Sequence, residues 1–172
     1  EPKNAFRRMP NRLIFVSKAH AFILSSAQPN ARLMKLLPKI DSLILNRMEA
    51  SVLLGHDYDR FKEMNKKILD SGVKVSIITD GKRGVGVGSS EGFLRIKAFK
   101  SKSVDDTGAG DAFCSGYIAF RLMDEPLVNC IKAGLSNGSS VVVKIGAKAG
   151  LLDKKSMEKW MNKRIEILNE SF

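Results

Sequence analysis

The stretch Ser103–Phe113, SVDDTGAGDAF, places three acids and two glycines directly before an apolar segment rich in helix-forming residues. Gly108 and Gly110 permit backbone angles and close approaches that a side chain would block. A helix that starts here offers free N–H groups and the positive end of its dipole, which together attract anions. Asp111 would lie in the first turn, where the same dipole stabilises a carboxylate. The stretch therefore predicts a loop that turns into a buried helix.

Two interpretations of this helix start are open. In the first, Thr107 or Asp106 caps an ordinary helix, and Asp111 only complements its dipole. In the second, the loop is a site that handles an anion. A simple cap needs neither two glycines nor two further acids, so the composition favours the anion site without excluding the cap.

Outward from this stretch, strand and helix patterns alternate along the chain. SLIL (42–45) and VKVSIIT (73–79) are nearly continuous apolar or β-branched runs, typical of buried strands. NRMEASVLLG, after the first run, predicts a helix that Gly55 ends. This alternation predicts the α/β class, with a mostly parallel sheet flanked by helices. The other expected elements are a strand at 21–24, a short helix over 31–40 ending near Pro38, hairpin strands near 84–88 and 93–98, and helices over 57–71, 109–123, 127–144 and 157–168.

Length and charge set broader limits. The 172 residues correspond to one domain, so we expect residues 1–172 to form a single, partial domain. The net charge is +11, and residues 1–40 hold eight basic side chains against one acid. No motif of alternating aromatic and basic residues accompanies this charge, which disfavours a nucleic-acid surface. A solvated basic face that attracts phosphorylated ligands is the better interpretation, and the basic segment 1–20 stays unassigned.

The two cysteines and the hydropathy pattern bear on location. Cys114 and Cys130 lie in helical patterns without metal-ligand spacing, which indicates reduced core residues in a cytoplasmic protein. No apolar run approaches the roughly 18 residues that span a membrane. No signal-peptide pattern is visible at the start. We therefore expect no membrane partner.

Two more polar segments follow expected strands directly. Asn46 and Glu49 come after SLIL, at the carboxyl edge of the sheet, where open α/β sheets bind ligands. Their spacing also fits a capping box with Asn46 as N-cap, and taken alone that is the better interpretation. TDGKRGVGV (79–87) likewise follows a strand and carries glycines, and a tight hairpin explains it equally well. A cap or a tight turn explains any one of these segments, but it explains three of them in this order less well.

Together these segments resemble the signatures of the ribokinase-like family, also called the PfkB carbohydrate kinases. VDDTGAGDAFCSGY (104–117) is similar to the family's Asp-Thr-Thr-Gly-Ala-Gly-Asp-x-Phe pattern, with Asp106 in place of a hydroxyl residue. NRME (46–49) matches Asn-x-x-Glu, and TDGKRG (79–84) matches Thr-x-Gly-x-x-Gly. AGLSNGSSVVVKIGA (133–147) resembles the late small-residue helix that ends in Gly-Ala. The resemblance covers residues 21–152 and implies a ribokinase-like fold.

The resemblance implies a catalytic role for the opening stretch. Asp111 would be the general base that accepts the proton of a substrate hydroxyl as it attacks the γ-phosphate of ATP. Gly108, Ala109 and Gly110 would present backbone N–H groups to the charge that develops on the phosphoryl oxygens. Asp106 adds a negative charge beside those phosphates. Lys82, Arg83 and Lys144 are the cations that could offset it, although each is better interpreted as a solvated side chain.

The resemblance also implies a set of cofactor positions. Asn46 and Glu49 would organise Mg²⁺ and phosphate through water, since Mg²⁺ keeps much of its hydration. The remaining implied positions are Thr79, Gly81 and Gly84 at the nucleotide phosphates, Asn137 and Gly146 near the adenine, and Asp105 with the Gly146–Ala147 region at a monovalent cation such as K⁺.

The family's N-terminal half is not visible in this chain. In full-length members that half supplies most of the sugar pocket, a glycine pair and a β-lid, so we expect this chain to be a C-terminal portion. The expected function is ATP-dependent phosphorylation of a hydroxyl of a sugar or nucleoside. One alternative is a non-catalytic nucleotide-binding remnant. Another, from the charge alone, is a nucleic-acid-binding domain, which would bind with a steep salt dependence and no response to ATP.

Truncation would expose apolar surface, because the sheet would lose neighbours along one edge. We therefore predict that the 172-residue chain forms a homo-oligomer or is poorly soluble unless a partner covers that edge. Sedimentation velocity over a range of concentrations checks this prediction. A clean monomer at high concentration would contradict it.

Overall fold

The computed structural model describes residues 21–23, 35–55, 61–170 and 172, so the basic segment 1–20 lies outside the described residues. The chain divides into two compact units. Unit 1 holds the described residues up to Thr79, together with Gly86–Leu94 and Asn169–Phe172. Unit 2 holds Asp80–Val85 and Arg95–Leu168. The expectation of one domain over the whole chain stays a prediction.

The strands form one sheet of six, in the order β1-β2-β3-β4-β5-β6. β1 (Ala21–Ile23), β2 (Ser42–Asn46) and β3 (Val75–Thr79) are parallel neighbours. β4 (Val85–Ser89) and β5 (Gly92–Ile96) are joined by only two residues, a connection that antiparallel strands alone can make. The sheet is therefore mixed, with the predicted parallel strands and the predicted hairpin side by side.

The register of the parallel strands aligns their polar ends. Asn46 is the partner of Thr79, at the carboxyl ends of β2 and β3. Two of the segments singled out in the sequence therefore lie at the same edge of the sheet, as predicted. Leu43, Ile44 and Ile77 are at most 3% exposed, so both faces of these strands are buried. This burial explains why the strand sequences are almost continuously apolar.

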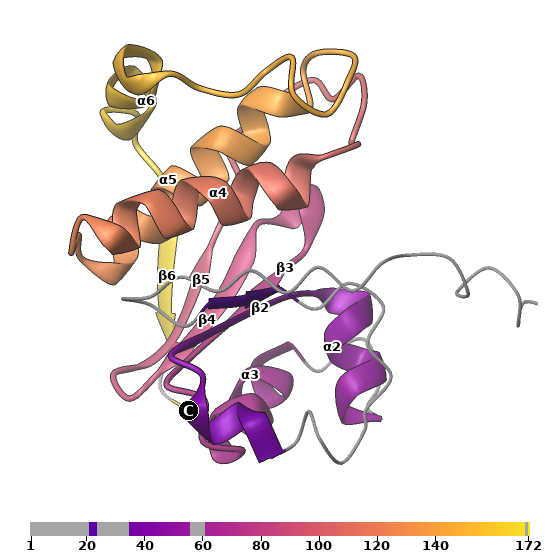
Figure 1. Cartoon of the computed structure of the whole chain (residues 1–172), viewed down its shortest axis with the longest axis vertical. Coiled ribbons are helices and arrows are strands. Elements are labelled where there is room, and N and C mark those ends of the chain that lie inside the picture. The colour runs from indigo at the N-terminus through magenta and orange to yellow at the C-terminus, as the bar shows by residue number, and fades with distance from the viewer. Residues whose placement is uncertain (1–20, 24–34, 56–60, 171) are drawn as a thin grey trace, which may run out of the picture. The chain divides into compact units, whose positions relative to one another are not determined.

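Two helices cover one face of the parallel strands in unit 1. α2 (Arg47–Leu54) and α3 (Phe61–Asp70) lie side by side there (Figure 1). α2 ends at Gly55, whose φ of 61° is left-handed, which confirms the predicted end. Each large side chain buried in the core contributes roughly 2 kcal/mol to folding. The core of unit 1 consists of Leu37, Ile40, Leu43, Leu45, Ala50, Leu53, Phe61, Met64, Ile68, Val73, Ile78 and Phe93.

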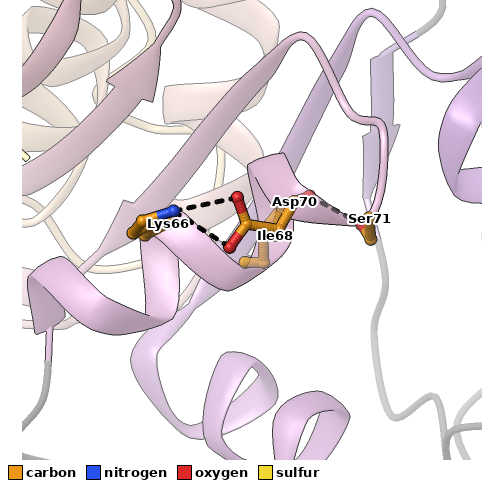
Figure 2. Close-up of polar contacts among 4 residues, drawn as sticks. All are labelled: Lys66, Ile68, Asp70 and Ser71. Carbon is orange, nitrogen blue, oxygen red and sulfur yellow. Dashed lines mark hydrogen bonds and ion pairs between the residues drawn. The ribbon is translucent and has the colours of Figure 1, made fainter.

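Figure 2 shows how α3 ends. Lys66 pairs with Asp70 one turn later, with Nζ 3.1 Å from each carboxylate oxygen. Both side chains are more than half exposed, so this ion pair contributes only about 0.3–0.5 kcal/mol. The Ser71 hydroxyl donates to the carbonyl of Ile68 at 2.6 Å and satisfies one of the free carbonyl groups at the helix end. Gly72, with a φ of 96°, then leads the chain away from the helix.

Two short 3-10 turns flank the parallel strands. The predicted helix over 31–40 ends in the turn η2 (Leu37–Lys39), one residue beyond Pro38, and its first residues lie outside the described ones. The turn η3 (Gly81–Arg83) follows β3 and lies within the TDGKRG segment.

Unit 2 is built on a pair of long helices. α4 (Ala109–Leu122) and α5 (Leu127–Val141) run along each other, as Figure 1 shows. A Cβ added at Gly116 would lie 2.7 Å from the carbonyl oxygen of Ala133, closer than any side chain permits. Small residues therefore let the two backbones approach, and both predicted helices are confirmed.

The two cysteines lie in this helix pair. Cys114 and Cys130 are buried and free, which confirms the prediction that they are core residues. Burial raises the pKa of the Cys130 thiol, which lies 3.3 Å from the carbonyl oxygen of Glu125. In the part of the chain that the structure describes, no helix is both long and apolar enough to cross a membrane.

The helix predicted over 157–168 is present only as far as Met161, and its predicted continuation to residue 168 was wrong. α6 spans Lys154–Met161 and begins earlier, because the Asp153 carboxylate caps it. The chain then forms β6 (Ile167–Glu170), which lies next to β5 in the sheet. Pairing with a neighbouring strand outweighs the helical spacing of the apolar residues.

Gly86 in β4 provides a test of the core packing. A methyl group at Gly86 would lie 2.2 Å from the ring of Phe61, whereas one at Gly88 would lie 3.1 Å from the movable end of Leu69. We expect Gly86→Ala to lower the free energy of unfolding by about 1–3 kcal/mol. The matched control, Gly88→Ala, should change it by less than about 1 kcal/mol. Urea unfolding followed by circular dichroism measures both, and equal midpoints would rule out this packing.

Candidate functional site

α4 begins in a conformation that only glycine adopts readily. Its N-cap is Gly108, with a left-handed φ of 80° and no side-chain cap. A Cβ at this position would also lie 2.6 Å from the Cβ of Ala147. The alternative interpretation, a cap from Thr107 or Asp106, is therefore wrong. The helix start meets a neighbouring loop instead of its own side chains.

The missing cap leaves backbone donors open at the helix start. The Ala112 N–H donates to the Gly108 carbonyl at 2.9 Å, and the Ala109 N–H donates to the Asp106 carbonyl at 3.3 Å. Among the described residues, no hydrogen bond engages the N–H groups of Gly110 and Asp111. The Asp111 side chain is exposed. Open donors beside the positive end of a 14-residue helix suit an anion.

Asp105 ties this helix start to the loop that follows α5. Its carboxylate accepts the N–H of Thr107 at 2.9 Å and the N–H of Gly146 at 3.0 Å. Hydrogen bonds from the Thr107 hydroxyl, from the Gly146 N–H and from the Thr107 N–H lower the pKa of Asp105. The carbonyl of Val142 accepts the N–H groups of Val104 and Asp105 at 2.7 and 3.2 Å. The loops 103–108 and 142–147 are thus held together by backbone groups and one carboxylate.

Asp106 and Asp80 each have a polar partner close to them in the chain. Asp106 accepts a hydrogen bond from the Ser103 hydroxyl within its own loop. Arg83, which the sequence favoured as a solvated side chain over a counter-charge for Asp106, is 61% exposed and pairs with Asp80 at 3.0 Å. Asp80 also lies 4.0 Å from Arg95, and its side chain is only 6% exposed. The sequence did not single out Asp80, although its place inside the TDGKRG segment was the available signal.

The TDGKRG segment forms the tight connection that its glycines suggested. The Thr79 hydroxyl donates to the carbonyl of Leu45 at 3.3 Å and so links the ends of β3 and β2. Gly81 and Gly84 both have positive φ values, of 52° and 95°. A Cβ at Gly84 would lie 2.0 Å from the carbonyl oxygen of Ile96. Packing alone therefore requires glycine at position 84.

Asn46 and Glu49 form the capping box that the sequence suggested. The Asn46 amide oxygen accepts the Glu49 N–H, and a Glu49 carboxylate oxygen accepts the Asn46 N–H, both at 2.8 Å. Burial raises the pKa of Glu49, and the hydrogen bond from Asn46 opposes this. Among the described residues, no three His, Cys, Asp or Glu side chains cluster as a metal cage. Mg²⁺ needs only one or two carboxylates besides water and phosphate, so the pair fits a water-mediated role.

Asn137 is buried, with 5% exposure, and its amide is engaged on both sides. Its Nδ2 donates to the Ala112 carbonyl at 2.9 Å and to the Ser115 hydroxyl at 3.0 Å. Its Oδ1 accepts the Leu152 N–H at 3.0 Å. Both amide hydrogens are therefore used within the protein, and the role near adenine stays a prediction.

The predicted positions fall into two groups, one in each unit. The group in unit 1 lies at the carboxyl ends of β2 and β3 and contains Asn46, Glu49 and Thr79. The group in unit 2 surrounds the start of α4 and contains Asp105, Gly108, Ala109, Gly110, Asp111, Asn137 and Gly146. Gly81 and Gly84 also belong to unit 2 and lie in the turn that follows β3.

Comparison with known proteins identifies relatives of this chain. Residues 12–155 match the family described as pfkB family carbohydrate kinase. The chain is 30% identical over 142 residues to a ribokinase of Staphylococcus aureus, covering 79% of this chain and 47% of that protein. It is 30% identical over 116 residues to a cytidine kinase of Thermococcus kodakarensis, covering 66% and 41%.

A solved structure is similar as well. The ribokinase of Arabidopsis thaliana, complexed with ribose and ATP, matches with a TM-score of 0.70 and 25% identity, covering 76% of this chain and 44% of that one. The chain thus spans less than half the length of each of these relatives.

The hydrogen bonds to Asp105 give a pH-dependent prediction. Because they lower the pKa of Asp105 in the folded state, its stabilising contribution is complete above the unfolded pKa of about 4. That contribution is lost as the pH falls through the lower folded pKa. Asp105→Asn should therefore reduce the free energy of unfolding at pH 7, and the difference from wild type should shrink below about pH 4. Urea unfolding over this pH range measures it.

Asp124→Asn is the matched control for Asp105→Asn. Asp124 is exposed at the end of α4, and asparagine tolerates its φ of 56°. This substitution should leave stability close to that of wild type. A difference in unfolding free energy between Asp105→Asn and wild type that is as large at pH 3 as at pH 7 would disprove that ionisation of Asp105 stabilises the fold.

Proposed function

Because this chain belongs to the pfkB family of carbohydrate kinases, we propose that it carries the nucleotide side of an ATP-dependent phosphotransferase. The acceptor is a hydroxyl of a sugar or a nucleoside, since its relatives include ribokinases and a cytidine kinase. One observation carries the proposal. The helix start at Gly108 has open N–H donors, and the exposed carboxylate of Asp111 lies in the same turn.

In this proposal, Asp111 accepts the proton of the acceptor hydroxyl while that hydroxyl attacks the terminal phosphate. Backbone N–H groups of Gly108, Ala109 and Gly110 donate toward the charge that develops on the transferred group. For Ala109 this means that its N–H exchanges its 3.3 Å hydrogen bond to the Asp106 carbonyl for one to the phosphoryl oxygen. The dipole of α4 adds to the same field. Phosphoryl transfer depends mostly on such positioning and electrostatic stabilisation, so one helix start supplies both the base and the donors.

The residues at the strand ends fit the cofactors. Mg²⁺, when bound with ATP, neutralises charge on the phosphate oxygens. Asn46 and Glu49 would hold its water shell, because the capping box engages only one carboxylate oxygen of Glu49 in a hydrogen bond from Asn46. The remaining nucleotide positions in this proposal are Thr79, Gly81 and Gly84 at the phosphates, and Gly146, with Asn137 behind it, on the adenine side.

A monovalent cation such as K⁺ is part of the proposal, at the loops around Asp105. The lowered pKa keeps Asp105 ionised, and its carboxylate joins the two loops through Thr107 and Gly146. A carboxylate beside backbone carbonyl groups is a suitable oxygen set for such an ion.

We also propose a cytoplasmic location. The support is that Cys114 and Cys130 are both free thiols buried in the core, and thiols stay reduced in that compartment.

A second candidate function is a nucleotide-binding remnant without catalysis. The matched region spans 47% of the Staphylococcus aureus ribokinase and 41% of the cytidine kinase, and in this candidate these residues bind ATP without an acceptor. The two candidates share the phosphate-binding helix start and differ only in whether an acceptor hydroxyl reaches Asp111.

Asp111→Asn tests the proposed function, because it removes the proton acceptor and keeps the size of the side chain. We expect ATP-dependent phosphorylation, assayed over a panel of sugars and nucleosides, to fall on the order of 10²- to 10⁴-fold. ATP affinity, measured by calorimetry with Mg²⁺, should change far less. Asp124→Asn, at the opposite end of α4, is the control that should retain full activity.

The outcomes separate the candidates. Phosphorylation that is unaffected by Asp111→Asn would sink the assigned base. Binding of ATP with Mg²⁺ but no phosphorylation of any acceptor would favour the remnant. A chain that binds no ATP would overturn both.

A further inference from the structure

Asn137 joins three segments of unit 2 through one buried side chain. Its Nδ2 donates to the Ala112 carbonyl in the first turns of α4 and to the Ser115 hydroxyl one turn further. Its Oδ1 accepts the N–H of Leu152, where the loop after α5 ends. Ala112 directly follows Asp111. The amide of Asn137 therefore sets how the start of α4 lies against α5 and the loop 142–152.

The other end of the same loop is also fastened to the helix start. The Gly146 N–H donates to Asp105, and Ala147 packs against Gly108 so closely that a Cβ there would come within 2.6 Å. The loop 142–152 is therefore attached to the start of α4 directly at Gly146 and Ala147, and indirectly at Leu152 through Asn137. A shift at one attachment must therefore be transmitted to the other.

The packing around Asn137 leaves little room for adjustment. A Cβ at Gly138, the next residue, would lie 3.1 Å from the carbonyl oxygen of Ala109. A Cβ at Gly150 would lie 2.2 Å from the carbonyl oxygen of Ser140. Close packing of this kind transmits strain, because closely packed atoms cannot be compressed further to absorb a displacement.

We propose that Asn137 is a positioning residue for the phosphate-binding helix start, and that it acts through Ala112 and Leu152 without contacting the nucleotide. This rests on the proposed function. Both amide hydrogens of Asn137 are engaged and the residue is only 5% exposed, so a hydrogen bond donated by its amide nitrogen to the base would break a buried one. Such a break leaves a buried polar group unsatisfied, which is unfavourable.

ATP and inorganic tripolyphosphate together distinguish the two roles, because tripolyphosphate has phosphates and no base. Asn137→Ala removes all three hydrogen bonds. We expect the Kd of the 172-residue chain for both ligands, measured by calorimetry with Mg²⁺, to rise by a similar factor, on the order of tenfold. A rise for ATP alone would overturn the proposal, because it would mean that Asn137 contacts the base.

Ser136→Ala is the matched control. Ser136 is also buried on α5, but its hydroxyl donates within that helix, to the Lys132 carbonyl at 2.8 Å. This substitution should leave both Kd values unchanged, and a loss equal to that of Asn137→Ala would count against a specific role for Asn137. Wild type that binds neither ligand would instead overturn the proposed function, and this inference with it.

Amide hydrogen exchange provides a readout that does not need a ligand. The Leu152 N–H should lose protection in Asn137→Ala and keep it in Ser136→Ala.

Asn137→Asp covers the case in which Asn137→Ala does not fold, because it keeps the volume and the acceptor for Leu152 but cannot donate to Ala112. It should retain Leu152 protection and weaken both ligands. Leu152 protection that persists in Asn137→Ala, or an effect of Asn137→Asp on ATP alone, would overturn the positioning role.

Discussion

The contact between Gly108 and Ala147 is the constraint on which the candidate site in unit 2 depends. No side chain fits between these two backbones, and Gly108 is left-handed. The helix start therefore takes its position from the loop 142–147, with Asp105 bridging the two. An uncapped helix end is ordinarily a cost of about 1 kcal/mol. Here the neighbouring loop holds the helix start in place, and the donors that a cap would occupy stay open.

Close packing of small residues extends this constraint beneath the site. Gly116 on α4 faces the backbone of Ala133, and Gly138 on α5 lies under the carbonyl of Ala109. Helices this close have few ways to slide, and the buried amide of Asn137 adds hydrogen bonds between α5 and the first turns of α4. Rigid support of this kind suits phosphoryl transfer, in which positioning contributes much of the rate enhancement.

In unit 1, structural and functional interpretations of the same residues coincide. Asn46 and Glu49 satisfy the first N–H groups of α2, which explains both residue types without any ligand. The register that pairs Asn46 with Thr79 also brings them to the edge where α/β sheets bind ligands. Capping fixes the direction of the Glu49 carboxylate. The capping role is therefore compatible with the role proposed for Glu49 at Mg²⁺.

Local signals in the sequence determined the parallel strands, the hairpin, the end of α2 at Gly55 and the capping box, because each depends on residues a few positions apart. Family motifs pointed to the residues around Asp111, whose catalytic roles stay proposals. Only the tertiary structure decided that the expected last helix ends at Met161 and is followed by β6. It also decided that Gly108 is the N-cap of α4, without a side-chain cap from Thr107 or Asp106. It also showed where the amide of Asn137 is used. The physical reason is distance along the chain: Asp105 and Gly146 are 41 residues apart, and Asn137 and Ala112 are 25 apart, so no local pattern specifies these partners.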